Sequence, residues 1–180
     1  MVLAMTPAPH LPASAPPRGR GGERLGASHD ATDPSGADAP DGASGGGATR
    51  PLDRLRILVV DDEVDARELF AMVLRSTGAL VTVAGSVDEA LAAFVEQRPD
   101  ILVSDIGMPG QDGYSLIRRV RMLSAEAGGT VPAVALTAFT GPEHRARALD
   151  AGFTMHVPKP VDPDRLIAVA TQLSALLRAR

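Results

Sequence analysis

Five short apolar runs, separated by stretches with helical periodicity, constrain the fold of this chain more than any other feature of its sequence. The runs are rich in Val, Ile and Leu, and several are apolar throughout. They are LRILVV (55–60), LVTVA (80–84), ILVS (101–104), PAVALT (132–137) and MHVP (155–158). Strands that are buried on both faces of a parallel sheet have this composition. The sequence therefore predicts five strands of a parallel sheet.

Amphipathic stretches follow the runs and predict five helices. Their apolar stripes are Leu69, Phe70, Val73 and Leu74; Ala90, Leu91, Phe94 and Val95; Leu116, Ile117, Val120 and Leu123; a weaker one within 144–151; and Leu166, Val169, Ala170, Leu173 and Leu177. Gly78 suits a helix end, and Ser86 to Glu89 is a capping-box pattern. Asp162 before Pro163 suits a helix start. This alternation predicts a parallel sheet covered by helices on both faces, in a chain too short for an eight-fold barrel.

The first 50 residues differ in composition from the rest of the chain. They hold 16 glycine and proline residues, against 17 in the other 130. Such a segment buries too little apolar surface to offset the entropy of ordering it. We therefore expect residues 1–52 to be a disordered Ala/Gly/Pro-rich tail, either a linker or upstream sequence, and residues 53–180 to form one domain.

The overall composition argues against several classes of function. The chain has no cysteine, which excludes thiolate metal sites and disulfides. Its formal net charge of -4 argues against nucleic acid as the main partner, because phosphate binding needs clustered Lys and Arg. No apolar run approaches the 18 or so residues of a membrane span, and the first residues make a poor signal peptide. We expect a cytoplasmic protein without membrane or nucleic-acid partners.

Acidic, hydroxyl and amine side chains stand at the ends of four of the five predicted strands. Asp61 and Asp62 follow the first strand, Asp105 the third, Thr137 ends the fourth, and Lys159 follows the fifth. In open parallel sheets, ligands bind beyond the carboxyl ends of the strands, which meet at one edge. Taken singly, an aspartate pair suits a helix cap, a lone aspartate a turn, and a lysine a solvated loop. Their coincidence at one edge favours a common site.

The chemistry of this set indicates phosphoryl transfer. Three carboxylates in one cleft repel one another, and a hard divalent cation such as Mg²⁺ relieves that repulsion. A metal held in this way also neutralises the charge of an incoming phosphoryl group. An ammonium and a hydroxyl supply further contacts to phosphoryl oxygens. One carboxylate would then act as the nucleophile and two would order the metal.

The motifs DD, D-x-G-M-P-G-x-D-G, T-A and K-P extend from about Arg54 to the chain end, and in combination they resemble the receiver domain of two-component response regulators. The resemblance implies a flavodoxin-like doubly wound sheet with five parallel strands in the order 2-1-3-4-5 and five helices. It implies that Asp105 is the phosphoacceptor. It also implies a Mg²⁺ site made by Asp105, Asp62, Asp61 acting through water, and the backbone carbonyl of Gly107.

The resemblance assigns further roles at the same edge. Thr137 would bind a phosphoryl oxygen and act as the switch hydroxyl. Lys159 would pair with the acyl phosphate, and the Lys159–Pro160 bond is expected to be cis.

Three positions depart from the common pattern of the family. His156 stands where many receivers carry a Tyr or Phe switch, and this resembles receivers attached to hybrid sensor kinases; a plain surface histidine is the alternative. Gly107 stands where a larger side chain often lies near the phosphoryl group. Phe139 follows Thr137 by two residues. Our hypothesis is that Phe139 slows self-dephosphorylation by restricting the access of water.

The function implied by the resemblance is that of a phosphoacceptor, not an enzyme, with at most slow self-dephosphorylation. The donor would be a histidine kinase or a histidine phosphotransfer protein. Phosphorylation of Asp105 would alter the surface of the fourth helix, fifth strand and fifth helix for an unidentified downstream protein. We expect no DNA-binding output domain. The sequence is consistent both with a stand-alone receiver and with a receiver detached from a hybrid kinase.

Three rival functions are less consistent with the residues. An acid-nucleophile phosphatase usually needs a second acid two residues after the nucleophile, where this chain has Gly107. A dinucleotide-binding protein needs a glycine-rich turn after the first strand, where this chain has DDEVDA. A pseudo-receiver that only binds a partner would need an inert metal site.

Overall fold

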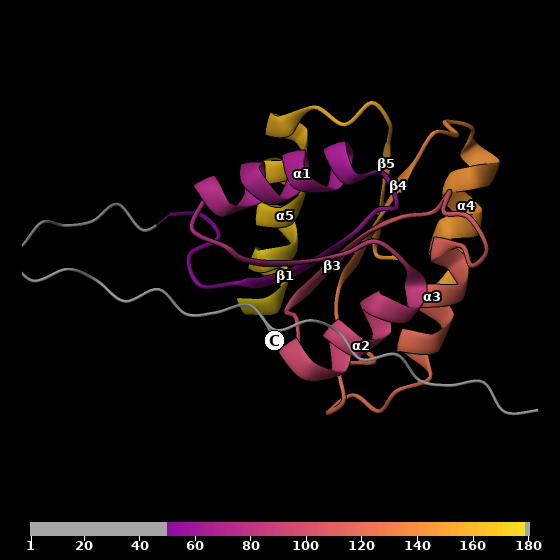
Figure 1. The fold of residues 1–180 in the computed structure, drawn as a ribbon, viewed down its shortest axis with the longest axis horizontal. Helices are drawn as coiled ribbons and strands as arrows, with labels where there is room; N and C mark the ends of the chain where they lie inside the picture. Colours follow the sequence, from indigo (N-terminus) through magenta and orange to yellow (C-terminus); the bar gives the residue numbers. More distant parts are fainter. Residues whose placement is uncertain (1–49, 179–180) are drawn as a thin grey trace, which may run out of the picture. The chain divides into compact units, whose positions relative to one another are not determined.

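The computed structural model describes residues 50–178, which contain five strands and five helices in strict alternation (Figure 1). The elements are β1 (Arg56–Val60), α1 (Val64–Ser76), β2 (Leu80–Ala84), α2 (Val87–Gln97), β3 (Ile101–Asp105), α3 (Gly113–Arg121), β4 (Ala133–Thr137), α4 (Pro142–Ala151), β5 (Met155–Pro158) and α5 (Pro163–Arg178). Each strand lies within one residue, at either end, of the apolar run that predicted it.

The five strands form one parallel sheet in the order β2-β1-β3-β4-β5. The predicted doubly wound, flavodoxin-like architecture with strand order 2-1-3-4-5 is therefore confirmed. The strand register aligns the ends of β1 and β3. Val60 of β1 pairs with Ser104 of β3, so the next residues, Asp61 and Asp105, stand level at the carboxyl edge of the sheet.

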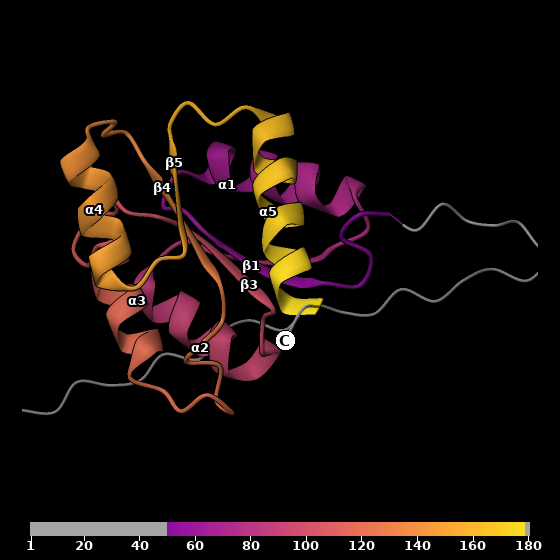
Figure 2. The same cartoon turned by 180° about the vertical axis from the view of Figure 1, so that it is seen from behind.

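Side chains alternate between the two faces of each strand, and each face is covered by its own helices. One apolar cluster joins Leu58 and Val60 of β1 to residues of α2, α3 and α4. The other joins Ile57 and Val59 of β1 to residues of α1 and α5. Figures 1 and 2 show this division, with α1 and α5 on one side of the sheet and α2, α3 and α4 on the other.

The predicted helix ends agree with the structure. Ser86 Oγ accepts a hydrogen bond from the backbone N–H of Glu89 at 3.3 Å, and the Glu89 carboxylate accepts one from Gly85 at 2.8 Å. Asp162 Oδ1 accepts bonds from two backbone N–H groups at the start of α5. Gly78, just beyond α1, has a φ of +93°, a conformation that glycine adopts without the steric cost of a Cβ.

Some positions of the predicted apolar stripes were wrong. Leu69 is 46% exposed and Val95 is 61% exposed, whereas Ala71 lies in the core. Leu69 and Val95 stand at the edges of their stripes. Successive helical residues are rotated by about 100°, so a stripe of four residues spans a wide arc of the helix surface. Its edge residues lie outside the part of that arc that packs on the sheet. Leu123 lies beyond the end of α3 and is only partly buried.

The structured domain includes residues that precede β1. Leu52, the last residue of the predicted tail, is fully buried in the α1–α5 cluster. Its backbone N–H bonds to the carbonyl of Thr77, and that of Arg54 bonds to the carbonyl of Gly78. Residues 1–49, the rest of that predicted segment, lie outside the described part of the chain. Within the described part, no helix combines the length and apolarity needed to cross a membrane.

Candidate functional site

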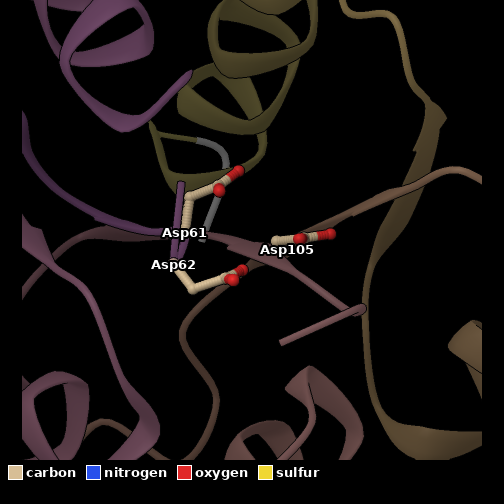
Figure 3. A group of neighbouring side chains, drawn as sticks. All are labelled: Asp61, Asp62 and Asp105. Carbon is tan, nitrogen blue, oxygen red and sulfur yellow. The ribbon is translucent and has the colours of Figure 1, made fainter. Parts of the chain in front are cut away.

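Three carboxylates meet at the carboxyl edge of the sheet. Asp61 and Asp62 follow β1 directly, and Asp105 is the last residue of β3. One oxygen of each carboxylate lies within 4.8 Å of the others, and Figure 3 shows the three side chains directed to the same side of these strand ends. Asp61 is fully buried and Asp105 is 6% exposed, while Asp62 is half-buried. The predicted cluster of acids is therefore assembled by the fold.

Lys159, the only lysine of the chain, lies between two of these acids. Its Nζ donates to Asp61 Oδ2 at 2.9 Å and lies 3.0 Å from Asp105 Oδ2. Burial lowers the pKa of Lys159, but the hydrogen bonds and charges of Asp61 and Asp105 outweigh it, so the pKa is raised overall. The ammonium thus partly neutralises the acids. The expected cis bond between Lys159 and Pro160 is present.

Backbone groups fix the two buried acids further. Asp61 Oδ1 accepts a bond from Glu63 N–H at 3.0 Å, and Asp105 Oδ1 accepts one from Gly107 N–H at 3.2 Å. Both oxygens of each acid therefore have a partner. Within residues 50–178, the Asp62 carboxylate has no such partner. Its oxygens are therefore not engaged by other groups of the described chain.

Gly107 and Gly113 shape the loop that follows Asp105. A Cβ at Gly107 would lie 3.9 Å from Asp105 Oδ2, an ordinary contact, so glycine leaves this side of the carboxylate open. A Cβ at Gly113 would instead collide with the backbone carbonyl of Asp105. The loop folds back at this point, where Gly113 N–H bonds to the carbonyl of Ile106 at 3.0 Å. Glycine at position 113 is thus required by the close approach of two backbone segments.

Thr137 ends β4 at the same edge and is 2% exposed. The strand register pairs Asp105 of β3 with Leu136, the residue before Thr137. Thr137 Oγ1 accepts a bond from Phe139 N–H at 3.1 Å, which leaves the hydroxyl proton available for another acceptor. The Phe139 ring is 58% exposed and stacks on His144 of α4, with 4.7 Å between ring centres.

His156 lies on β5, where its backbone pairs with Ala135. Its Nε2 is buried and has no hydrogen-bond partner among the described residues. Burial lowers the pKa of His156, the backbone of Phe139 opposes this, and the positive charge of Arg145 adds to the lowering. The neutral imidazole therefore predominates at neutral pH.

Arg67 is a residue of the site that the sequence analysis did not identify. Its Nη1 donates to the backbone carbonyl of Asp61 at 2.6 Å, which ties α1 to the loop that carries the acids. The i to i+6 spacing that makes this contact is not a recognised helix-start pattern. No signal in the sequence distinguishes Arg67 from a solvated helix residue.

The acidic cluster has a donor set that fits Mg²⁺. The three side chains offer only oxygen ligands, which this ion prefers. Ligands on opposite sides of an octahedral Mg²⁺ are about 4.2 Å apart, since each bond is about 2.1 Å long. The spacing within 4.8 Å is compatible with that geometry after small side-chain adjustments. Asp61, Asp62 and Asp105 are therefore the residues that would hold the ion.

Comparison with known proteins identifies the family. A family model described as the response regulator receiver domain matches residues 57–171. The chain belongs to the response regulator receiver family. This receiver is 47% identical over 121 residues to an uncharacterized 14.6 kDa protein of Leptolyngbya boryana, a match that covers 67% of this chain and 91% of that protein.

A second relative of the receiver is the DNA-binding response regulator MtrA of Mycobacterium tuberculosis, with 38% identity over 115 residues. That match covers 64% of this chain and 48% of MtrA, so the chain spans about half the length of the MtrA proteins that it matches.

Solved structures support the same assignment. The chemotaxis response regulator CheY4 of Vibrio cholerae has a TM-score of 0.63 and 29% identity, with 67% of this chain and 98% of CheY4 covered. A putative response regulator from Chloroflexus aurantiacus has a TM-score of 0.64 and 32% identity, with 68% and 99% covered. The predicted receiver domain of two-component signalling is confirmed.

Proposed function

We propose that this receiver accepts a phosphoryl group on Asp105 from the phosphohistidine of a histidine kinase or a histidine phosphotransfer protein. The observation that carries the proposal is the convergence of three carboxylates, two of which share the ammonium of Lys159. A carboxylate at a strand end, almost buried and held by Gly107 N–H, is well positioned as a nucleophile.

In the proposed reaction, an Asp105 carboxylate oxygen attacks phosphorus and the P–N bond to the donor imidazole breaks. The leaving imidazole keeps the electron pair of that bond and takes up a proton. Mg²⁺, held by Asp61, Asp62, Asp105 and the carbonyl of Gly107, would supply charge neutralisation for the transferred group. The reaction makes an acyl phosphate on the protein.

Two other side chains would contact the new phosphoryl group. Lys159 is already within 3.0 Å of Asp105 Oδ2 and carries a positive charge. Thr137 has a hydroxyl proton that is free to be donated, because its oxygen only accepts from Phe139 N–H. Both contacts favour the phosphorylated state through charge-assisted hydrogen bonds.

The docking surface for the phosphodonor would be the apolar pocket beside Lys159. This pocket has a volume of about 450 Å³ and lies between α1 and the β5–α5 loop, with Leu69, Phe70 and Pro160 in its wall. Its position gives a protein partner access to the phosphoacceptor edge, and it accounts for the exposure of Leu69. The output surface would be α4, β5 and α5, which carry His156 and follow Thr137 in the chain.

We propose that the protein acts in the cytoplasm as a phosphoacceptor with at most slow self-dephosphorylation, rather than as an enzyme. A rival, an acid-nucleophile phosphatase, would turn over a small phosphate ester. Gly107 stands where such an enzyme usually has its second acid. Steady release of phosphate from the ester, with many turnovers per chain, would favour the rival.

The experiment is acid-labile labelling of the full chain by a radioactive small phosphodonor with Mg²⁺. Asp105→Asn should abolish the label, and Asp62→Asn should reduce it strongly, because both remove an acid of the cluster. The matched control is Asp150→Asn, which changes an exposed aspartate at the far end of α4 and should be labelled like the native chain. Undiminished labelling of Asp105→Asn would place the acceptor elsewhere.

A further inference from the structure

Arg67, in the first turn of α1, contacts the loop that carries two of the three acids. Its Nη1 donates to the backbone carbonyl of Asp61 at 2.6 Å. That carbonyl belongs to the planar peptide group between Asp61 and Asp62, so the bond restrains the orientation of this peptide. The same orientation determines the direction in which the Asp62 side chain leaves the backbone. Arg67 therefore acts on the main chain one peptide group away from the Asp62 carboxylate.

Asp62 is the acid whose position depends most on its own backbone. Lys159 and backbone N–H groups hold the carboxylates of Asp61 and Asp105 directly. No group in the described part of the chain bonds to the Asp62 carboxylate, although Figure 3 shows it directed to the same side as the other two. An acid of this kind keeps its place through the main chain that carries it. The bond from Arg67 supplies a restraint on that main chain.

The start of α1 is fixed to this loop through Arg67 rather than through a side-chain cap. The N-cap residue, Glu63, makes no capping bond with its side chain. Its backbone N–H bonds to Asp61 Oδ1 at 3.0 Å, and its carbonyl accepts the backbone N–H of Arg67 at 3.0 Å. Arg67 is thus joined to the loop by both its main chain and its side chain.

Gly85, directly after β2, leaves room for the guanidinium of Arg67. A Cβ at position 85 would lie only 3.0 Å from Arg67 Nη1, closer than side chains normally pack. The backbone N–H of Gly85 is bonded to the Glu89 carboxylate at 2.8 Å, so it does not depend on Arg67. Glycine at this position therefore lets the guanidinium reach the Asp61 carbonyl past the end of β2.

The guanidinium of Arg67 makes few other contacts. Within residues 50–178 it forms no ion pair with a carboxylate. Its Nε is buried and has no hydrogen-bond partner in the same range. A buried donor without a partner costs free energy, so the contact with the Asp61 carbonyl accounts for the placement of the group better than its general satisfaction does.

We propose that Arg67 is a positioning residue of the metal site, which holds the Asp61–Asp62 peptide so that the Asp62 carboxylate is preorganised to bind Mg²⁺. The inference rests on the metal site of the proposed function and adds to it a residue that does not touch the ion. Groups that orient metal ligands raise metal affinity, and the loss of one weakens it by about tenfold or more.

An effect of the Arg67 charge alone would have the opposite sign. A positive charge near three carboxylates competes with Mg²⁺, so its removal would strengthen metal binding. A purely structural role at the start of α1 would change stability and leave the affinity for Mg²⁺ as it is. Metal affinity therefore separates the three explanations.

The test measures the Mg²⁺ affinity of the full chain by isothermal titration calorimetry, and its stability by urea unfolding in a chelator. Arg67→Met keeps the aliphatic part of the side chain but removes the guanidinium, and it should weaken Mg²⁺ binding about tenfold. Gly85→Ala keeps Arg67 but displaces its guanidinium, and it should weaken binding about threefold, half of that effect in free energy. Gly85→Ala should have no further effect in the Arg67→Met background, because both changes act through one contact.

The matched control is Arg75→Met, which changes a second arginine of α1. Arg75 also donates to a backbone carbonyl, that of Val81 at 3.1 Å, but it lies in the last turn of the helix. Its replacement should lower stability without changing the affinity for Mg²⁺. The same result for Arg67→Met would identify its contact as structural only.

Unchanged or tighter Mg²⁺ binding by Arg67→Met, in conditions where the native chain binds the ion, would overturn this inference and leave the metal site intact. No binding of Mg²⁺ by the native chain would overturn both the site and the role of Arg67. Circular dichroism in the chelator checks that each variant is folded. If Arg67→Met is not folded, unchanged affinity in Gly85→Ala overturns the inference by itself.

Discussion

Replacing Lys159 with methionine should destabilise the receiver in a way that depends on Mg²⁺. The ammonium bridges Asp61 and Asp105 at 2.9 and 3.0 Å, and Asp61 is fully buried. Breaking a buried ion pair from one side costs about 3–5 kcal/mol. The Lys159 side chain is 21% exposed, and solvent screens part of the interaction. We therefore expect a loss of about 2.5 kcal/mol in the unfolding free energy without metal.

Saturating Mg²⁺ should reduce that loss to about 1 kcal/mol, because the ion supplies the positive charge that the variant lacks. By thermodynamic linkage, the difference of about 1.5 kcal/mol must also appear in the metal affinity. The Lys159→Met variant should then bind Mg²⁺ about tenfold more tightly than the native chain. The lysine and the ion are thus expected to compete for the same negative charge.

Urea unfolding followed by far-ultraviolet circular dichroism suits this chain, which has no tryptophan. Each variant is unfolded with a chelator and with saturating Mg²⁺, and calorimetry measures metal binding directly. Lys159→Arg keeps the charge and should lose less stability than methionine. Arg118→Met, which removes an exposed charge, should change stability by less than about 0.5 kcal/mol. An equal loss with and without metal, or weaker metal binding by Lys159→Met, would refute the reasoning.

Three further predictions concern single side chains. Phe139→Ala should shorten the lifetime of the acyl phosphate, as a chase of labelled protein would show; an unchanged or longer lifetime would contradict the shielding hypothesis. The pKa of His156 is lowered in the folded state, so its contribution to stability should be present above the unfolded pKa and be lost as the pH falls through the lower folded value. Urea titrations should therefore show a smaller loss between pH 7.5 and 5 for His156→Gln than for the native chain, and an equal loss would contradict this. Leu52→Ala should cost about 3 kcal/mol, since the side chain is fully buried; a change below about 1 kcal/mol would show that Leu52 does not pack in solution.

The strands were predictable because the information is local and repeated, whereas their order was implied only by the resemblance to the receiver family. Each apolar run is short and flanked by polar loop residues, so its ends are marked in the sequence. The helix ends were predictable where a side chain caps the backbone, as at Ser86 and Asp162. The flanks of the helical stripes were not, as Leu69 and Val95 show, because their burial depends on how far the sheet extends under each helix.

The composition of the acidic cluster was also predictable, whereas the contacts around it were not. Asp61 and Asp105 are brought together by strand register, a consequence of the fold that places every strand end at one edge. The contact of Arg67 with the Asp61 carbonyl depends on a side-chain conformation, and the stacking of Phe139 on His144 depends on the path of one loop. Neither leaves a pattern in residue spacing. We predicted the start of the domain from the change in amino-acid composition. A single apolar residue such as Leu52 has too little effect on composition to be recognised in this way.

The position of Lys159 links the stability of the receiver to its proposed chemistry. In the structure its ammonium is shared by Asp61 and Asp105, so it balances charge before any phosphoryl group is present. A phosphoryl group on Asp105 would convert that carboxylate into an ester-like acyl group and move the negative charge outward. The ammonium would then interact more strongly with the phosphoryl oxygens than with Asp105 Oδ2. The same side chain therefore balances charge in the resting site and would favour the phosphorylated one, and it lies on the loop that joins β5 to α5.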